Sequence, residues 1–355
     1  MERSVIMKLL RIPSALQARR RASRLVFSEY GSPHEVLKYQ SDLKEEVMSD
    51  PSSDIRVKMK YAPVNPADIN VIQGVYPTKP DILPAVPGGE GLGEVVEAPA
   101  SSSFSVGDWV FPAGRKHGTW RTEFVAKASE LVKIRSDIDP IGAAMLKINP
   151  STAYLMLKTF TSLSPGDVVI QNGANSGVGR SLIQIARSMD ITTVNVIRKR
   201  EGLEDLKRDL SSLGADHVLT EEELRSTDLF KSQRISKAKL AFNCVGGASS
   251  TEIGKCLEFR GKHITYGGMS MKPVTAATSS LIFKDISFHG FWLSRWFEEH
   301  SAEEASHMLN TLADLLKSNQ LQAPPHKIVP LREFHEAVSL KGFRNAKYIL
   351  DFFKE

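Results

Sequence analysis

The chain has 355 residues, of which 41% are hydrophobic and 25% are charged, a composition typical of a folded globular protein and not of a disordered or fibrous one. The formal net charge of +5 is too small an excess to indicate nucleic-acid binding by itself, and no apolar run approaches the roughly 20 residues that cross a bilayer. The length exceeds that of a usual single core and predicts two domains. The two cysteines, Cys244 and Cys256, exclude a disulfide scaffold.

The first 23 residues differ in composition from the rest. The stretch "MKLLRIPSALQARRRAS" places basic residues among leucines and alanines and contains no acidic residue, a pattern typical of a mitochondrial presequence. We therefore predict a targeting segment at residues 1–23 and a mature protein in the mitochondrial matrix. Glu2 counts against this prediction, and a disordered basic tail or an expression remnant is the alternative interpretation.

Residues 24–147 alternate short β-rich runs with turn-forming residues. The runs "RLVFSEYG", "IRVKMKYAPVNPAD", "GLGEVVEA" and "GDWVFPAG" are punctuated by Gly, Pro, Asn and Asp. Runs of this length with such punctuation predict a small antiparallel β-rich domain. We expect no helix of any length in it.

The pattern changes at "NPSTAYLMLKTF", where Pro150 suits a helix start. Strand and helix then alternate, since "DVVIQNG" is followed by the helical "GRSLIQIARSM" and "TTVNVIR" by the helical "GLEDLKRDLSSLG". Regular alternation with nearly continuous apolar strands predicts a parallel sheet with helices on both faces. The predicted fold class is therefore α/β, with a doubly wound, Rossmann-type domain at 148–292 and a β-rich domain made of 24–147 and the returning segment 293–355.

The turn "QNGANSGVGRS" is the predicted phosphate site. Gly173, Gly177 and Gly179 follow a predicted strand and precede a predicted helix, so the backbone can approach a pyrophosphate and the helix N-terminus can face its charge. The spacing departs from strict GxGxxG, and the strand-turn-helix context carries the prediction. A tight turn that merely needs glycines is the alternative.

The end of the next strand predicts which dinucleotide is bound. About 20 residues after the glycine turn, an acidic residue would bind the 2′-hydroxyl of NAD, whereas a cation accommodates the 2′-phosphate of NADP. This chain has Arg198, Lys199 and Arg200 there, and guanidinium groups offer forked donors to phosphate oxygens. We predict NADPH as the cofactor, with a solvated basic loop as the alternative.

A β-rich domain, a doubly wound domain and a returning C-terminal segment together resemble the medium-chain dehydrogenase/reductase superfamily, which implies a GroES-like fold for the β-rich domain. In its zinc-using members a Gly-His-Glu segment supplies a metal ligand. This chain reads "VPGGEGLGEV", with Gly89 where the histidine would stand, and has no cysteine in the N-terminal domain. We therefore expect no bound metal.

Within the zinc-free group, the segments "NPADINVIQGVYPTKP", "KINPSTAY", "NSGVG", "VIRKR", "TYGGM" and "FHGFWLSRW" resemble mitochondrial enoyl thioester reductases. The resemblance implies NADPH-dependent reduction of trans-2-enoyl thioesters, carried by coenzyme A or an acyl carrier protein, in mitochondrial fatty acid synthesis. It also implies that Tyr76 of "QGVYP" is the proton donor. A tyrosine that simply caps a turn before Pro77 is the alternative.

The same resemblance implies a set of cofactor contacts. The matching positions are Asn149, Asn175, Ser176, Gly177, Val178, Arg198, Lys199, Arg200, Tyr266, Gly267, Gly268, Met269, Phe291, Trp292, Leu293 and Lys347.

Partners follow from the same resemblance and from charge. In this superfamily the edge strand of the nucleotide-binding sheet often pairs with its twin, so "SLIFKDISFHGF" predicts a homodimer. Cations near the site segments are candidates for the acidic carrier of the substrate: Lys79, Arg115, Lys116 and Arg295. Two other functions fit the cofactor pattern: an NADPH:quinone oxidoreductase, and a non-catalytic NADPH-binding protein.

Overall fold

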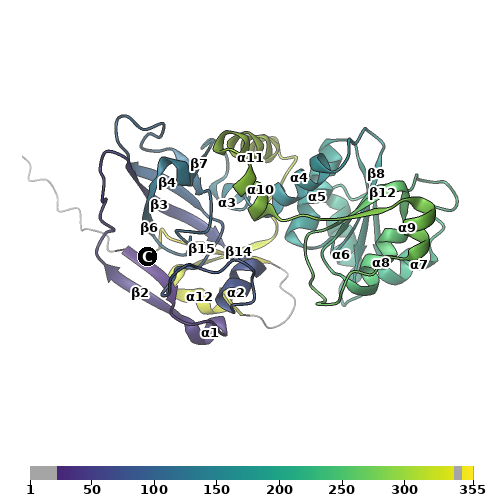
Figure 1. Ribbon diagram of the computed structural model, residues 1–355, viewed down its shortest axis with the longest axis horizontal. Coiled ribbons are helices and arrows are strands. Elements are labelled where there is room, and N and C mark those ends of the chain that lie inside the picture. The colour runs from purple at the N-terminus through teal and green to yellow at the C-terminus, as the bar shows by residue number, and fades with distance from the viewer. Residues whose placement is uncertain (1–21, 340–345, 355) are drawn as a thin grey trace, which may run out of the picture.

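The computed structural model describes residues 22–339 and 346–354, so almost all of the predicted targeting segment lies outside the described residues. Two lobes lie side by side, one rich in antiparallel strands and one built on a parallel sheet (Figure 1). The predicted α/β fold class is confirmed. Among the residues that the structure describes, no helix combines the length and the apolar character needed to cross a membrane.

The β-rich lobe is built on a seven-stranded sheet with the order β14-β15-β3-β4-β5-β7, in which β6 also pairs with β3. Its strands are β3 (Asp54–Pro63), β4 (Leu92–Glu97), β5 (Trp109–Pro112), β6 (Glu123–Lys127), β7 (Leu131–Ile134), β14 (His326–Pro330) and β15 (Lys347–Asp351). A separate pair, β1 (Ala22–Phe27) and β2 (Leu37–Leu43), is antiparallel. The C-terminal strands thus return to the sheet that the N-terminal half begins, because β15 pairs with β3.

Short helices join these strands, and the expectation that this region has no helix is wrong. Within 24–147 they are α1 (Pro33–Val36), α2 (Pro66–Ile72) and α3 (Pro140–Ala144), with a 3₁₀ turn at Ala128–Glu130. The returning segment adds α12 (Phe334–Ala337) and a 3₁₀ turn at Leu331–Glu333. The helix α2 begins with proline directly after Asn65, whose backbone N–H donates to the Asp68 carboxylate (3.0 Å). Proline at the first position and an acid in the first turn are ordinary helix-start signals.

The second lobe is a six-stranded parallel sheet with the order β10-β9-β8-β11-β12-β13. Its strands are β8 (Val168–Asn172), β9 (Thr192–Ile197), β10 (His217–Thr220), β11 (Ala238–Asn243), β12 (Leu257–Thr265) and β13 (Ser287–Gly290). The helices are α4 (Asn149–Thr159), α5 (Gly177–Ser188), α6 (Leu203–Ser212), α7 (Glu221–Ser226), α8 (Gly247–Lys255) and α9 (Thr278–Lys284). All residues of β8 are buried, as expected for a strand covered by helices on both faces.

The strand order reverses between β8 and β11. In a doubly wound sheet this reversal lies beside the carboxyl ends of the strands, where ligands bind. The edge that carries the carboxyl ends of β8, β9, β12 and β13 is therefore the expected cofactor edge.

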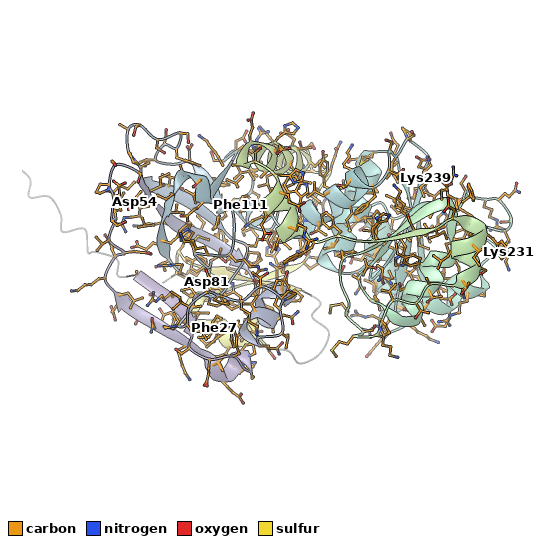
Figure 2. The ribbon with its side chains drawn as sticks, in the orientation of Figure 1. Phe27, Asp54, Asp81, Phe111, Lys231 and Lys239 are labelled. Carbon is orange, nitrogen blue, oxygen red and sulfur yellow. The ribbon has the colours of Figure 1, made fainter. Side chains whose placement is uncertain are left out.

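One apolar core runs from one lobe into the other. Leu92 and Phe111 of the β-rich sheet share a buried cluster with Leu155 of α4, Leu182 of α5 and Leu309 of α11 (Ala302–Lys317). The helices α10 (Leu293–Glu299) and α11 (Ala302–Lys317) lie near the junction of the lobes (Figure 1). Figure 2 shows Phe111 inside the β-rich lobe and Lys231 at the far end of the parallel-sheet lobe. The lobes are held by shared burial as well as by the chain that connects them.

Candidate active site

The glycine turn after β8 has the geometry that close backbone approach requires. Gly173 has φ +61°, and the Ser176 hydroxyl accepts a hydrogen bond from the Gly179 N–H (3.1 Å) at the start of α5. A Cβ on Gly177 would lie 2.9 Å from the Asn149 amide, and one on Gly179 would lie 2.5 Å from the carbonyl oxygen of Ala174. A side chain at these positions would collide with its neighbours. The N-terminus of α5 is available to face a pyrophosphate.

The structure brings the predicted cofactor residues of this turn together with Asn149. Asn175 to Val178 are all partly exposed, and Asn149, the first residue of α4, lies against Gly177. Asn149 and Gly177 also line a small pocket with Ser181 of α5.

The predicted segment Tyr266–Met269 follows β12 at the same edge of the sheet. Its backbone is tied to β11 by hydrogen bonds from Tyr266 N–H to the Asn243 oxygen (3.0 Å) and from Met269 N–H to the Cys244 oxygen (2.9 Å). The Tyr266 hydroxyl is buried and makes no hydrogen bond of normal geometry, and burial raises the pKa of Tyr266 well above its ordinary value. A buried hydroxyl without a partner is uncommon, and it fits a residue whose partner is a bound cofactor.

The three predicted 2′-phosphate cations follow β9, which is hydrogen-bonded to β8. Arg198 and Lys199 are exposed and Arg200 is partly exposed, at the edge where the glycine turn also lies. The residues present therefore fit a dinucleotide with an extra phosphate on its ribose.

Tyr76 and Trp292 join the two lobes. Trp292 Nε1 donates a hydrogen bond of 3.0 Å to the Tyr76 hydroxyl oxygen. Tyr76 follows α2 in the β-rich lobe, where its own backbone N–H donates to the Asn70 oxygen (3.1 Å). Trp292, with its predicted neighbours Phe291 and Leu293, follows β13 at the cofactor edge. The predicted proton donor and one predicted cofactor contact are thus direct neighbours.

The β-rich lobe also holds two buried carboxyl groups, Asp68 and Glu90, which the sequence did not predict. Asp68 accepts hydrogen bonds from the Gly89 N–H (2.9 Å) and Arg115 Nη1 (3.0 Å) in addition to that from Asn65. Glu90 accepts from Asn65 Nδ2 (2.8 Å) and the Ile148 N–H (2.7 Å). Both residues have no exposed surface. Burial raises the pKa of Glu90, and the charge of a nearby lysine, Lys347, opposes this rise.

Two lysines lie in this region: Lys147 is buried and Lys347 is partly buried. The Lys347 amine donates to Asn65 Oδ1, so this predicted cofactor residue lies on β15 in the β-rich lobe and contacts the residue before α2. The Lys147 amine donates to the carbonyl oxygens of Pro112 and Gly89 (3.3 Å for the latter). Burial lowers the pKa of Lys147 to about 7, and the positive charge of Arg115 adds to the shift.

Comparison with known proteins decides the family. Residues 51–136 match the model described as alcohol dehydrogenase GroES-like domain, and residues 177–313 match that described as zinc-binding dehydrogenase. The chain is 46% identical over 344 residues to the human mitochondrial enoyl-[acyl-carrier-protein] reductase, covering 95% of this chain and 90% of the relative. The chain belongs to the mitochondrial enoyl-[acyl-carrier-protein] reductase family. The family resemblance found in the sequence is confirmed.

Solved structures of family members agree with this assignment. The Etr1p/NADP/crotonyl-CoA complex is 32% identical with a TM-score of 0.85, covering 93% of this chain and 99% of that chain. The mitochondrial 2-enoyl thioester reductase Etr1p/Etr2p heterodimer from Candida tropicalis is 33% identical with a TM-score of 0.84 and the same coverage. Although one matching model is named for zinc, no group of three or more His, Cys, Asp or Glu side chains within 22–339 and 346–354 could hold a metal ion.

The basic segment after β9 yields a prediction on cofactor choice. Arg198→Ala and Lys199→Ala should each raise the Kd for NADPH by roughly tenfold to a hundredfold, because a hydrogen bond to a charged group is worth about 1.5–3 kcal/mol. The Kd for NADH should stay within about twofold, since NADH lacks the 2′-phosphate. Fluorescence titration measures both. Lys231→Ala is the control, because this exposed lysine precedes β11 and so lies at the opposite edge of the sheet. Equal losses for NADH and NADPH would contradict the assignment.

The buried Lys147 yields a prediction on pH. Its folded-state pKa of about 7 lies below its ordinary value of 10.5, so between these values the unfolded chain holds a proton that the folded chain lacks. This group therefore makes the free energy of unfolding rise with pH across that window, by at most about 1.4 kcal/mol per pH unit. In Lys147→Met the contribution is gone. The free energy of unfolding of the variant, relative to that of the wild type, should be highest below pH 7 and should fall toward pH 10, as measured by urea unfolding.

The control for Lys147 is Lys158→Met, which removes an exposed lysine from α4. A difference between Lys147→Met and the wild type that stays constant from pH 6.5 to 10 would show that Lys147 is not buried as a neutral amine.

Proposed function

We propose that this chain uses NADPH to reduce the carbon–carbon double bond of trans-2-enoyl thioesters, producing saturated acyl thioesters for mitochondrial fatty acid synthesis. The observation that carries the proposal is the hydrogen bond of 3.0 Å between Trp292 Nε1 and the Tyr76 hydroxyl. It places a phenol of one lobe beside the cofactor edge of the other. The family membership supports the same reaction.

The cofactor would be held by the glycine turn and the basic segment described above. Backbone N–H groups at the start of α5 would face its pyrophosphate, and Arg198, Lys199 and Arg200 would bind its 2′-phosphate. When bound, NADPH supplies a hydride to the β-carbon of the substrate. The apolar and aromatic residues that pack around the lobe junction, among them Phe291, Leu293 and Trp296, would exclude water from that path.

Tyr76 is the proposed donor to the thioester. Its oxygen accepts from Trp292, so the phenolic hydrogen remains free for another acceptor. Reduction at the β-carbon moves negative charge to the thioester oxygen, and a hydrogen bond aimed there stabilises that charge. The phenol could instead give its proton to the α-carbon, and the geometry allows both roles.

Tyr76→Phe removes only the hydroxyl and tests this role. The kcat for crotonyl-CoA reduction should fall by roughly a hundredfold to ten-thousandfold, the range for losing a general acid, while the Kd for NADPH changes by less than about threefold. NADPH oxidation followed by its absorbance measures the rate. A variant that retains more than about half of the wild-type kcat would contradict the role of Tyr76. Loss of enoyl reduction with retained quinone reduction would separate this function from that of a quinone oxidoreductase.

The names of the relatives indicate the carrier of the acyl group and the location of the protein. One solved relative is a complex with crotonyl-CoA, and the curated relatives are named for acyl carrier protein and for mitochondria; we place this chain in the matrix. Of the four candidate cations, Lys116 pairs with Glu130 (2.5 Å), while Arg115 pairs with buried Asp68. Comparing kcat/KM for a crotonyl group on coenzyme A and on an acyl carrier protein decides between the carriers.

A homodimer through β13 is also proposed. This strand ends the parallel sheet, so its outer edge is unpaired among the described strands. Nearby α9 exposes apolar side chains, with Ile282 66% and Phe283 76% exposed. Exposed apolar residues beside an open sheet edge suit contact with a second copy.

The double variant Ile282→Glu, Phe283→Glu tests the dimer. In a dimer of the variant, the new carboxylates of one subunit would face those of the other and repel them. The variant should therefore be a monomer by light scattering at concentrations where the wild type is a dimer. Its melting temperature should stay within a few degrees of the wild type's if the residues are solvent-facing in the monomer. A variant that still forms dimers would place the interface elsewhere.

A further inference from the structure

Arg115 fills the space that a side chain at position 89 would occupy. A Cβ built on Gly89 would lie 2.5 Å from Arg115 Cζ and 2.7 Å from both terminal guanidinium nitrogens. No backbone atom is among these nearest neighbours, so a side chain at position 89 would displace the guanidinium from this place. The position of the Arg115 guanidinium therefore depends on the glycine at position 89.

A buried carboxylate holds this guanidinium in place. Arg115 Nη1 lies 3.0 Å from Asp68 Oδ1, and the Asp68 side chain is fully buried while that of Arg115 is 24% exposed. Asp68 is itself fixed by the backbone N–H groups of Asn65 and Gly89. The planar guanidinium is thus anchored on its inner side and open on its outer side.

The guanidinium lies over the ring of the proposed proton donor. Arg115 Cζ is 5.2 Å from the centroid of the Tyr76 ring, within the range of a cation–π contact. Trp292 holds the phenol oxygen from the other lobe. Tyr76 is therefore held at its ring by a cation and at its hydroxyl by an indole N–H.

We propose that Arg115 is a positioning residue for Tyr76. Gly89 leaves room for its guanidinium and Asp68 anchors it, so that it holds the ring of the phenol that donates to the thioester oxygen. Electrostatic groups fixed before reaction are effective because they need not reorganise. The inference rests on the proposed function.

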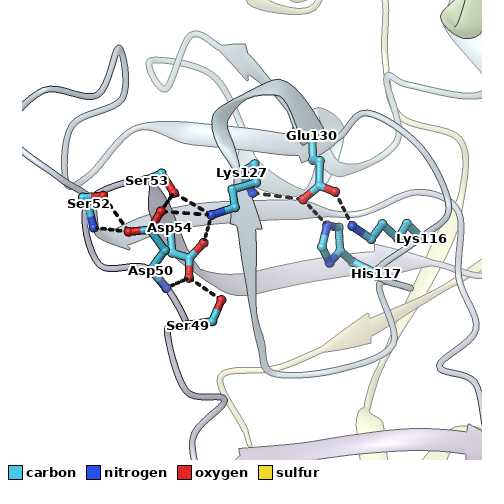
Figure 3. A network of polar contacts seen from close by, with 9 residues as sticks. All are labelled: Ser49, Asp50, Ser52, Ser53, Asp54, Lys116, His117, Lys127 and Glu130. Carbon is cyan, nitrogen blue, oxygen red and sulfur yellow. Dashed lines mark hydrogen bonds and ion pairs between the residues drawn. The ribbon is translucent and has the colours of Figure 1, made fainter.

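The competing explanation is that Arg115 only neutralises Asp68. Two variants separate the explanations. Arg115→Gln removes the charge, whereas Gly89→Ala keeps both Arg115 and Asp68 and displaces the guanidinium by the bulk of one methyl group. Lys127→Gln is the matched control, because Lys127 also pairs with a buried carboxylate, Asp54 (2.6 Å), in a network in the same lobe (Figure 3). Asp54 lies at the end of the β-rich lobe away from the other lobe (Figure 2).

The kinetic test uses crotonyl-CoA and NADPH. Arg115→Gln and Gly89→Ala should each lower kcat by roughly tenfold to a hundredfold with little change in the KM for NADPH, and the double variant should be no slower than Arg115→Gln. In a Tyr76→Phe background, Arg115→Gln should cost less than about threefold. Lys127→Gln should keep the wild-type kcat. Turnover by the wild type tests the proposed function, and only the ratios among variants test Arg115.

A spectroscopic test needs no activity. In protein labelled with 3-fluorotyrosine, the ¹⁹F resonance that Tyr76→Phe removes should shift or broaden in Arg115→Gln and in Gly89→Ala, and should not change in Lys127→Gln. An unchanged Tyr76 resonance in Arg115→Gln would overturn the inference. So would a kcat within twofold of the wild type, or an equal loss of kcat with and without the Tyr76 hydroxyl.

Discussion

Two carboxyl groups without exposed surface, Asp68 and Glu90, set the arrangement of the lobe junction. A buried carboxyl group is tolerated only when several donors surround it, and leaving one unpaired costs about 3–5 kcal/mol. The donors come from distant parts of the chain: Asn65 before α2, Arg115 before β6, and Ile148 at the start of the parallel-sheet lobe. Satisfying these two groups therefore fixes the relative positions of three segments.

The position of Tyr76 depends on that arrangement. The helix α2 starts directly after Asn65, and the turn that follows it carries Tyr76, whose N–H is bonded to the Asn70 oxygen. In the other lobe, Trp292 follows β13, which pairs with β12. The Phe291 N–H before it donates to the oxygen of Thr265, the last residue of β12. A phenol held from both lobes is preorganised, and preorganisation is what allows a single hydrogen bond to matter in catalysis. The absence of a side chain at position 89 leaves room for a cation beside this phenol.

Features set by local pattern could be predicted from the sequence. The alternation of strand and helix predicted the doubly wound lobe, and the glycine turn with the basic segment after the next strand predicted the cofactor edge, because each depends on neighbours in the chain. The buried carboxyl groups could not be predicted, since their hydrogen-bond partners lie up to 58 residues away in the chain, as with Glu90 and Ile148. The helix α2 was missed although Pro66 and Asp68 carry ordinary helix-start signals, because the β-rich runs around it outweighed them.

The central claim is that the Tyr76 hydroxyl and the nicotinamide meet over the same enoyl group at the junction of the lobes. The most direct test is a crystal structure of this chain with NADP and crotonyl-CoA bound. The account predicts the Tyr76 oxygen within about 2.6–3.2 Å of the thioester oxygen or in contact with the α-carbon, and the β-carbon facing C4 of the nicotinamide. A substrate bound with its thioester turned away from Tyr76, or with Tyr76 directed to bulk solvent, would contradict it.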